Sequence, residues 1–212
     1  MYRVDFPFKA KHDGQEFLGV KVNPSWEIVS RLPSTVHHKW MNIRIFNQPE
    51  PLRAAYHQLL EVPKLLEQFS PDIVIHIGLA VERDYFAIER GADRDGYHQY
   101  PDVVRKVFNK AENKKTWGKS PARLDSSLDL DGILAKWRAE TGKGVDLRIS
   151  DDVGSYVCGF LYYTSLEYFW KKGGDMPVVF MHVPPLPSKE DTARGERVTL
   201  ALIKAVSETI QK

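Results

Sequence analysis

The stretch Ile149-Ser-Asp-Asp-Val-Gly-Ser-Tyr-Val-Cys158-Gly-Phe-Leu-Tyr-Tyr-Thr-Ser165 organises this chain, because it predicts a strand end, a tight turn at Gly154 and a helix start. It holds the only cysteine of the protein. Unpaired N–H groups and the dipole at a helix N-terminus favour an anion, so the pKa of the Cys158 thiol is expected to fall, as a nucleophile requires. The alternative is a buried, inert thiol among apolar neighbours.

Strand and helix patterns alternate on both sides of this turn. Alternating apolar and polar residues predict a strand at residues 40–46, and further strands are predicted at residues 71–78, 145–149 and 177–183. Helical spacing predicts helices at residues 23–32, 51–69 with a kink or break at Pro63, from 125 to Gly142 or Gly144, 156–172 and 191–211. This alternation favours one α/β domain over residues 1–212, a three-layer α/β/α sandwich with helices on both faces of a mostly parallel or mixed twisted sheet.

Between residues 91 and 124 the periodicity is lost, and charged residues, Gly, Asp and Tyr dominate. A loop of this length is unusual in a compact domain, where it is commonly a functional cover or a disordered excursion. Whether this segment covers the site stays open.

Composition narrows the class of protein. The 212 residues are 42% apolar and 27% charged, with 30 basic against 28 acidic residues, so nothing calls for a nucleic-acid or membrane partner. A single cysteine rules out an internal disulfide and fits the cytosol. We see no membrane-spanning run, signal peptide or metal-ligand spacing, and expect a cytoplasmic protein without cofactor, either a monomer or a homo-oligomer.

Among the seven histidines, His182 is the best candidate for a base. It lies at the carboxyl end of an apolar strand, and we expect the strand before Cys158 to end at the same sheet edge, which would pair a thiol with an imidazole. Glu89, beyond a third strand on that edge, could orient the imidazole. His76 lies inside a strand and reads as a core histidine, whereas the other five read as solvated.

The motifs around these residues resemble those of the pyroglutamyl peptidase I family. Gly154-Ser-Tyr-Val-Cys158-Gly-Phe-Leu-Tyr-Tyr-Thr-Ser165 and Phe180-Met-His182-Val-Pro-Pro185 are similar to its cysteine and histidine motifs. Pro71-Asp-Ile-Val-Ile-His-Ile-Gly78 with Glu89-Arg90 is similar to its strand and catalytic glutamate, and Asn23-Pro-Ser-Trp26 is also similar to a family motif. Asp93-Arg-Asp-Gly-Tyr97 resembles the eukaryotic members in particular. The resemblance runs from about Asn23 to the C-terminus.

The resemblance implies a cysteine omega-peptidase that removes N-terminal pyroglutamate from peptides through a thioester. Cys158 would be the nucleophile, His182 the base and acid, and Glu89 the third triad member. By the same analogy, Leu79, Tyr156 and Val157 are expected to line the pyroglutamyl slot. The alternative for each of them is ordinary core packing. The alternative is a non-catalytic or specificity-shifted relative that binds peptides or partners.

The N-terminal segment departs from the family pattern. Family members carry Gly-Phe-x-Pro-Phe-Gly after the first strand, and its phenylalanines help to form the pyroglutamyl pocket. Here the full motif is absent, and either Pro7-Phe8 or Phe17-Leu18-Gly19 stands in its place. We therefore expect the chemistry to be better preserved than the specificity.

Overall fold

The computed structural model describes residues 8–9, 11–12, 15–16 and 23–209. The two candidates for the N-terminal pocket motif are Pro7-Phe8 and Phe17-Leu18-Gly19. Of these five residues only Phe8 lies within the described residues. The helices are α1 (Pro24–Val29), α2 (Tyr56–Leu59), α3 (Val62–Phe69), α4 (Lys110–Trp117), α5 (Leu130–Thr141), α6 (Val157–Lys171) and α7 (Lys189–Ser207).

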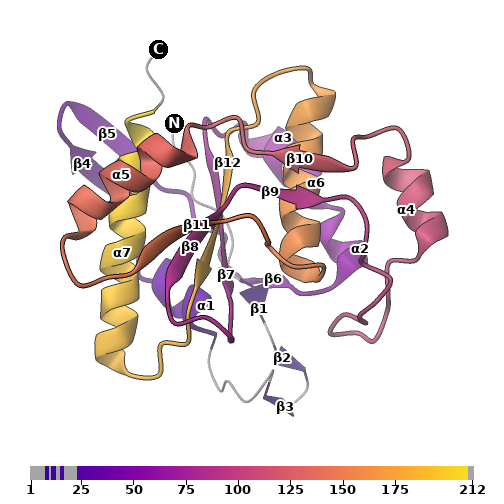
Figure 1. Ribbon diagram of the computed structural model, residues 1–212, viewed down its shortest axis with the longest axis horizontal. Helices are drawn as coiled ribbons and strands as arrows, with labels where there is room; N and C mark the ends of the chain where they lie inside the picture. Colours follow the sequence, from indigo (N-terminus) through magenta and orange to yellow (C-terminus); the bar gives the residue numbers. More distant parts are fainter. Residues whose placement is uncertain (1–7, 10, 13–14, 17–22, 210–212) are drawn as a thin grey trace.

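The central sheet has four strands in the order β11-β8-β12-β7 (Figure 1). Their bounds are β7 (Val74–Leu79), β8 (Phe86–Glu89), β11 (Leu147–Ser150) and β12 (Val178–Val183). β11 runs parallel to β8 and β12 runs parallel to β7, but β12 and β8 are antiparallel. The sheet is therefore mixed, two parallel pairs joined by one antiparallel ladder.

Four two-stranded sheets complete the strand content of the described residues. They pair β1 (Phe8–Lys9) with β6 (Leu52–Arg53), β2 (Lys11–His12) with β3 (Gln15–Glu16), β4 (Thr35–His38) with β5 (Met41–Arg44), and β9 (Gly91–Asp93) with β10 (Arg123–Asp125).

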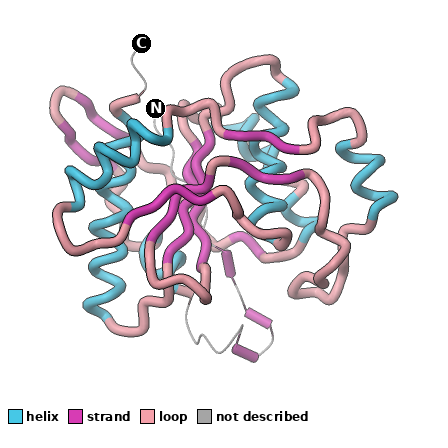
Figure 2. The backbone as a smooth tube through the Cα atoms, viewed as in Figure 1, coloured by secondary structure: helices cyan, strands magenta, loops and turns pink. Residues whose placement is uncertain are grey.

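The central sheet separates two apolar cores, because successive side chains of a strand point to opposite faces. In β12, Val179, Met181 and Val183 join a core formed with α1, α5 and α7, whereas Val178 and Phe180 join one formed with α2, α3 and α6. Figure 2 shows helices flanking the central strands on both sides. The predicted three-layer α/β/α architecture is confirmed.

Most of the predicted helices and strands are present, but one predicted helix begins differently and some elements were not predicted. The predicted helix at residues 51–69 is wrong at its start, where β6 forms, and it breaks before Pro63, which takes a first-turn position of α3. β8 lies at residues for which no strand was predicted. The aperiodic segment 91–124 contains β9, α4 and β10, and α4 has a capping box between Asn109 and Glu112.

Candidate active site

The polar side chains of the central sheet gather on the face that α6 covers. In the antiparallel ladder, Glu89 is opposite Phe180 and Ala87 is opposite His182. Because residues opposite each other share a face, as do residues two apart, Glu89 and His182 are diagonal neighbours on one face. Nδ1 of His182 lies 2.7 Å from Oε1 of Glu89. Backbone register brings this pair together.

The expectation that three strand ends share one sheet edge is wrong. β8 and β11 run opposite to β7 and β12, so their carboxyl ends lie at the other edge. Glu89 reaches His182 nevertheless, because β8 is short and ends opposite the middle of β12. The sequence pattern gave no sign of the strand direction of β8.

Cys158 lies in the first turn of α6 and is partly exposed. Gly154, with φ of 82°, begins the turn before it, and its carbonyl oxygen would lie 2.1 Å from a β-carbon on Gly159. The turn can therefore fold back on the helix only because residue 159 lacks a side chain. Gly78 gives similar room, since a β-carbon there would lie 3.1 Å from Sγ of Cys158. Gly78 is the register partner of His182, which ties the thiol to the His182 position.

The pKa of Cys158 is raised rather than lowered, which contradicts the sequence-based expectation. Burial raises it to about 12, the negative charge of Glu89 acts in the same direction, and Arg83 opposes them. Among the described residues no hydrogen bond joins Sγ to the His182 ring. At neutral pH the resting group is thus a thiol that needs a base.

Glu89 is fully buried, yet its pKa lies below the ordinary value. Burial opposes ionisation, but the hydrogen bond and charge of His182, the Ser150 hydroxyl and the charge of Arg83 together outweigh it. An ionised carboxylate only accepts hydrogen bonds, so Nδ1 of His182 must be the donor. The other ring nitrogen, Nε2, is then the one that can act as a base.

Cys158 and His182 open into one pocket of about 670 Å³. The three residues suggested for substrate binding, Leu79, Tyr156 and Val157, all line it. Val157 is buried and the other two are partly exposed. Burial, followed by the charges of Asp102 and Cys158, raises the pKa of Tyr156 to about 12, so its phenol keeps its proton.

The long segment 91–124 contributes to this pocket through Tyr100. It is anchored by Asp102, which is 4% exposed and accepts hydrogen bonds from the backbone N–H groups of Tyr56, Val104 and Lys106. The N–H of Val103 also bonds to the carbonyl of Ala54, another lining residue. The segment is therefore part of the wall of the pocket, a role that its sequence left open.

Arg83 was missed by the sequence reasoning. It lies between β7 and β8, lines the pocket, and contacts Glu89. Its only sequence signal was an arginine in a turn after a buried strand, which is common on protein surfaces. His76 is confirmed as a core histidine, since it is fully buried with Nε2 2.8 Å from Oγ of Ser165.

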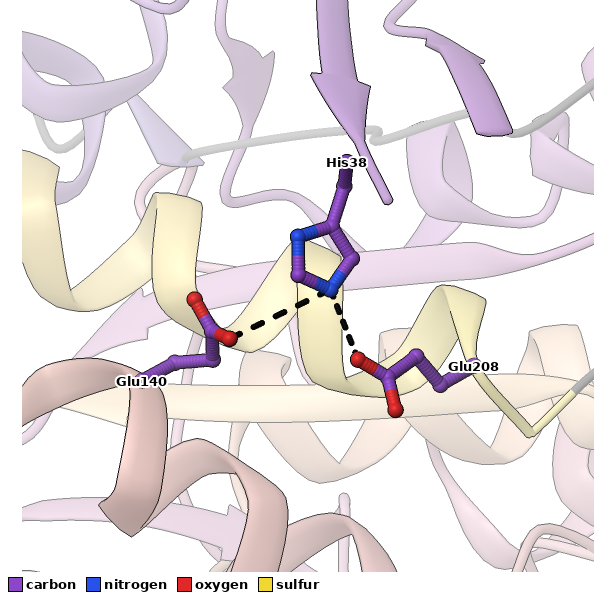
Figure 3. Close-up of side chains that lie close together, drawn as sticks. All are labelled: His38, Glu140 and Glu208. Atoms are coloured by element: carbon purple, nitrogen blue, oxygen red, sulfur yellow. Dashed lines mark hydrogen bonds and ion pairs between the residues drawn. The ribbon is translucent and has the colours of Figure 1, made fainter. Parts of the chain in front are cut away.

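One group in the described part of the chain, shown in Figure 3, has the donor set of a metal site. None of its three residues lines the pocket. His38, expected to be solvated, is buried, with Nε2 2.6 Å from Glu208 and 4.0 Å from Glu140. Three lysines already neutralise these carboxylates, namely Lys39, Lys136 and Lys204. The group is better described as an ion-pair network that joins β4, α5 and α7 than as a metal site.

Comparison with known proteins places this chain in a family. The family model described as pyroglutamyl peptidase matches residues 14–209. The chain belongs to the pyroglutamyl peptidase family. It is thus a cysteine peptidase of the pyroglutamyl-peptidase type, and the predicted resemblance is confirmed.

Individual relatives agree in fold and sequence. The chain is 31% identical over 176 residues to a pyrrolidone-carboxylate peptidase of Pyrococcus furiosus, which covers 82% of this chain and 79% of that protein. It is 26% identical to human pyroglutamyl-peptidase 1, covering 90% and 85% respectively. A solved structure of a mutant pyrrolidone carboxyl peptidase from P. furiosus superposes with a TM-score of 0.76 at 24% identity over both full chains.

None of the helices in the described ranges is both long enough and apolar enough to traverse a bilayer.

Proposed function

We propose that this protein hydrolyses the bond after an N-terminal pyroglutamyl residue in peptides, with Cys158 as nucleophile, His182 as base and acid, and Glu89 as the residue that orients His182. The observation that carries the proposal is the short Glu89–His182 contact beside a pocket that also contains Cys158. The peptidases of the same family support the choice of substrate.

In this reaction Nε2 of His182 takes the proton of the Cys158 thiol, and Sγ attacks the pyroglutamyl carbonyl carbon. The negative oxygen of the tetrahedral intermediate can bind the backbone N–H groups at the start of α6, where the Tyr156 side chain makes no capping hydrogen bond. His182 then protonates the leaving amine, which leaves a thioester. Water, deprotonated by His182, releases pyroglutamate and restores the thiol.

The raised pKa of Cys158 fits this order of events, because a neutral thiol must give up its proton as it attacks. Closer approach of Sγ to His182 is then expected once substrate is bound, since catalytic hydrogen bonds often tighten only in the complex. Leu79, Tyr156 and Val157 are proposed to line the slot for the lactam ring. Tyr156, which keeps its proton, can donate a hydrogen bond to the lactam.

We also propose that the chain is one domain, since both cores share the same four-stranded sheet.

The test is hydrolysis of a pyroglutamyl arylamide by the wild type beside Cys158→Ala, with a prolyl arylamide as the matched substrate that lacks the ring carbonyl. Turnover of the first substrate by the wild type alone, and of the second by neither, supports the proposal. A folded wild type that hydrolyses no pyroglutamyl substrate contradicts it and favours a relative that only binds peptides or partners. Turnover of a different blocked N-terminus instead would indicate shifted specificity.

A further inference from the structure

Arg83 contacts both halves of the candidate catalytic machinery. Its Nη1 donates a hydrogen bond to Oε1 of Glu89 at 2.6 Å. Its Nη2 donates to the carbonyl of Asp152 at 2.7 Å and to Oγ of Ser150 at 3.3 Å. Ser150 ends β11 and Asp152 lies in the turn that leads into the Cys158 helix. One guanidinium therefore spans the carboxylate of the Glu89–His182 pair and the turn before the thiol.

The carboxylate depends on this contact. Oε1 of Glu89 accepts hydrogen bonds from both Arg83 and His182, whereas Oε2 is buried and has no hydrogen-bond partner among the described residues. The Arg83 side chain is itself only 17% exposed, so the ion pair is largely shielded from solvent. Loss of the guanidinium would leave a fully buried carboxylate whose remaining polar neighbours are His182 and the Ser150 hydroxyl, with no arginine paired to it.

We propose that Arg83 is a positioning residue for peptide hydrolysis, which fixes Glu89, and through it His182, relative to the turn that carries Cys158. The inference rests on the proposed function. Arginine suits the role because its planar fork can hold a carboxylate and a carbonyl at once, which the single ammonium of lysine does not reproduce.

The groups that face Glu89 define the expected pH behaviour. They are Arg83 from the turn, His182 from β12, the Ser150 hydroxyl from β11, and Cys158 and Tyr162 from α6. The Tyr162 hydroxyl donates a hydrogen bond to the backbone carbonyl of Glu89. Arg83 is the cation that favours the ionised carboxylate whatever the state of His182. Without it the carboxyl takes up a proton more easily, so the acidic limb of the kcat/KM profile should move to higher pH.

The experiment measures kcat, KM and the pH profile for a pyroglutamyl arylamide. It compares the wild type with Arg83→Gln, Arg83→Lys and Arg83→Ala. Arg83→Ala is also measured with added guanidinium, at concentrations that do not unfold the protein. Arg148→Gln is the matched control, because Arg148 also lies over the Tyr85 ring but pairs with Asp146 at the surface. Thermal unfolding of each variant separates misfolding from misplacement.

We expect Arg83→Gln to lower kcat at least about tenfold, the factor that corresponds to one charge-assisted hydrogen bond, with KM little changed. Its acidic limb should move to higher pH, guanidinium should restore part of the activity of Arg83→Ala, and Arg148→Gln should behave like the wild type. If a folded Arg83→Gln has the same activity and pH profile as an active wild type, the role of Arg83 is overturned and the proposed function stands. An inactive wild type overturns the proposed function and this role with it.

Discussion

A β-carbon on Gly78 would lie 3.1 Å from Sγ of Cys158, so the thiol occupies space that only a glycine in β7 leaves open. The ring of Phe180 would lie 2.9 Å from the same carbon. Contacts this short require one of the neighbours to move. The position of the thiol is thus set by a residue on a different element from the one that carries it.

Gly78→Ala should therefore lower kcat/KM by at least about tenfold, because small displacements of a reacting group cost large factors in rate. Overpacking should also lower the free energy of unfolding by about 1–3 kcal/mol. The matched control is Gly174→Ala, where a β-carbon meets nothing within 4 Å. Steady-state kinetics and denaturant unfolding check both variants, and an active Gly78→Ala would show that Sγ does not need its present place.

The rate of Cys158 alkylation should depend on pH as expected for a thiol with a raised pKa. Since burial raises the pKa to about 12, the rate of inactivation by iodoacetamide should keep rising between pH 6 and about 10 without a plateau. Mass spectrometry of the modified peptide gives the rate for this one cysteine. A plateau below pH 8 would mean that a thiolate already exists in the resting protein, as the sequence suggested.

Glu89 links stability to pH. Its pKa in the folded protein lies below 4.5, so its contribution to stability is present above the unfolded value and is lost as the pH falls through the folded value. Glu89→Gln should thus be destabilised at pH 7, by an amount that shrinks on acidification below pH 4.5. Denaturant unfolding of both proteins from pH 7 to pH 3 measures this difference. A difference that stays constant over that range would argue against an ionised Glu89.

The same substitution should affect catalysis more strongly. The amide of glutamine can offer either a donor or an acceptor to Nδ1 of His182, so it no longer fixes the tautomer in which Nε2 is free of a proton. A comparable change in a serine triad lowers kcat about 10⁴-fold. We expect a loss of about 10²-fold or more in Glu89→Gln at pH 7. Turnover within a few-fold of the wild type would remove Glu89 from the proposed triad.

Asp102 should matter for substrate binding through the wall of the pocket. Asp102→Ala leaves three backbone N–H groups without their acceptor, which should cost about 2–4 kcal/mol of stability. Because Tyr100 and Ala54 depend on this anchor, KM should rise more than kcat falls. Asp175→Ala, at an exposed position, is the control. An effect on kcat alone would contradict a role in the wall.

Much of the fold could be predicted from the sequence because long apolar runs and helix caps are local signals. β7 and β12 were predicted within three residues at their starts and one at their ends, and Asn23 caps α1 as expected. The direction of β8 could not be predicted, since strand pairing depends on contacts between distant segments. The pKa of Cys158 was predicted in the wrong direction, because helix position is visible in the sequence and burial under a packed pocket is not.

The residues of the candidate site also differ in whether a local sequence pattern could predict them. Cys158, His182 and Glu89 were named from motifs, and the structure brings the last two into contact and the first into the same pocket. Arg83 and Asp102 had no motif, since their importance comes from contacts with distant segments. Arg83 bonds to Asp152, 69 positions away, and Asp102 bonds to Tyr56, 46 positions away.

The antiparallel ladder between β8 and β12 also has a consequence for folding. Glu89 and His182 are 93 positions apart, and a slip of one residue in their register would turn one of them to the opposite face. Contacts so distant in sequence are slow to form during folding. A nascent or partly folded chain would therefore have no working peptidase site. Recovery of activity after dilution from denaturant should lag behind the return of helical circular dichroism, and its time course would report when this ladder closes.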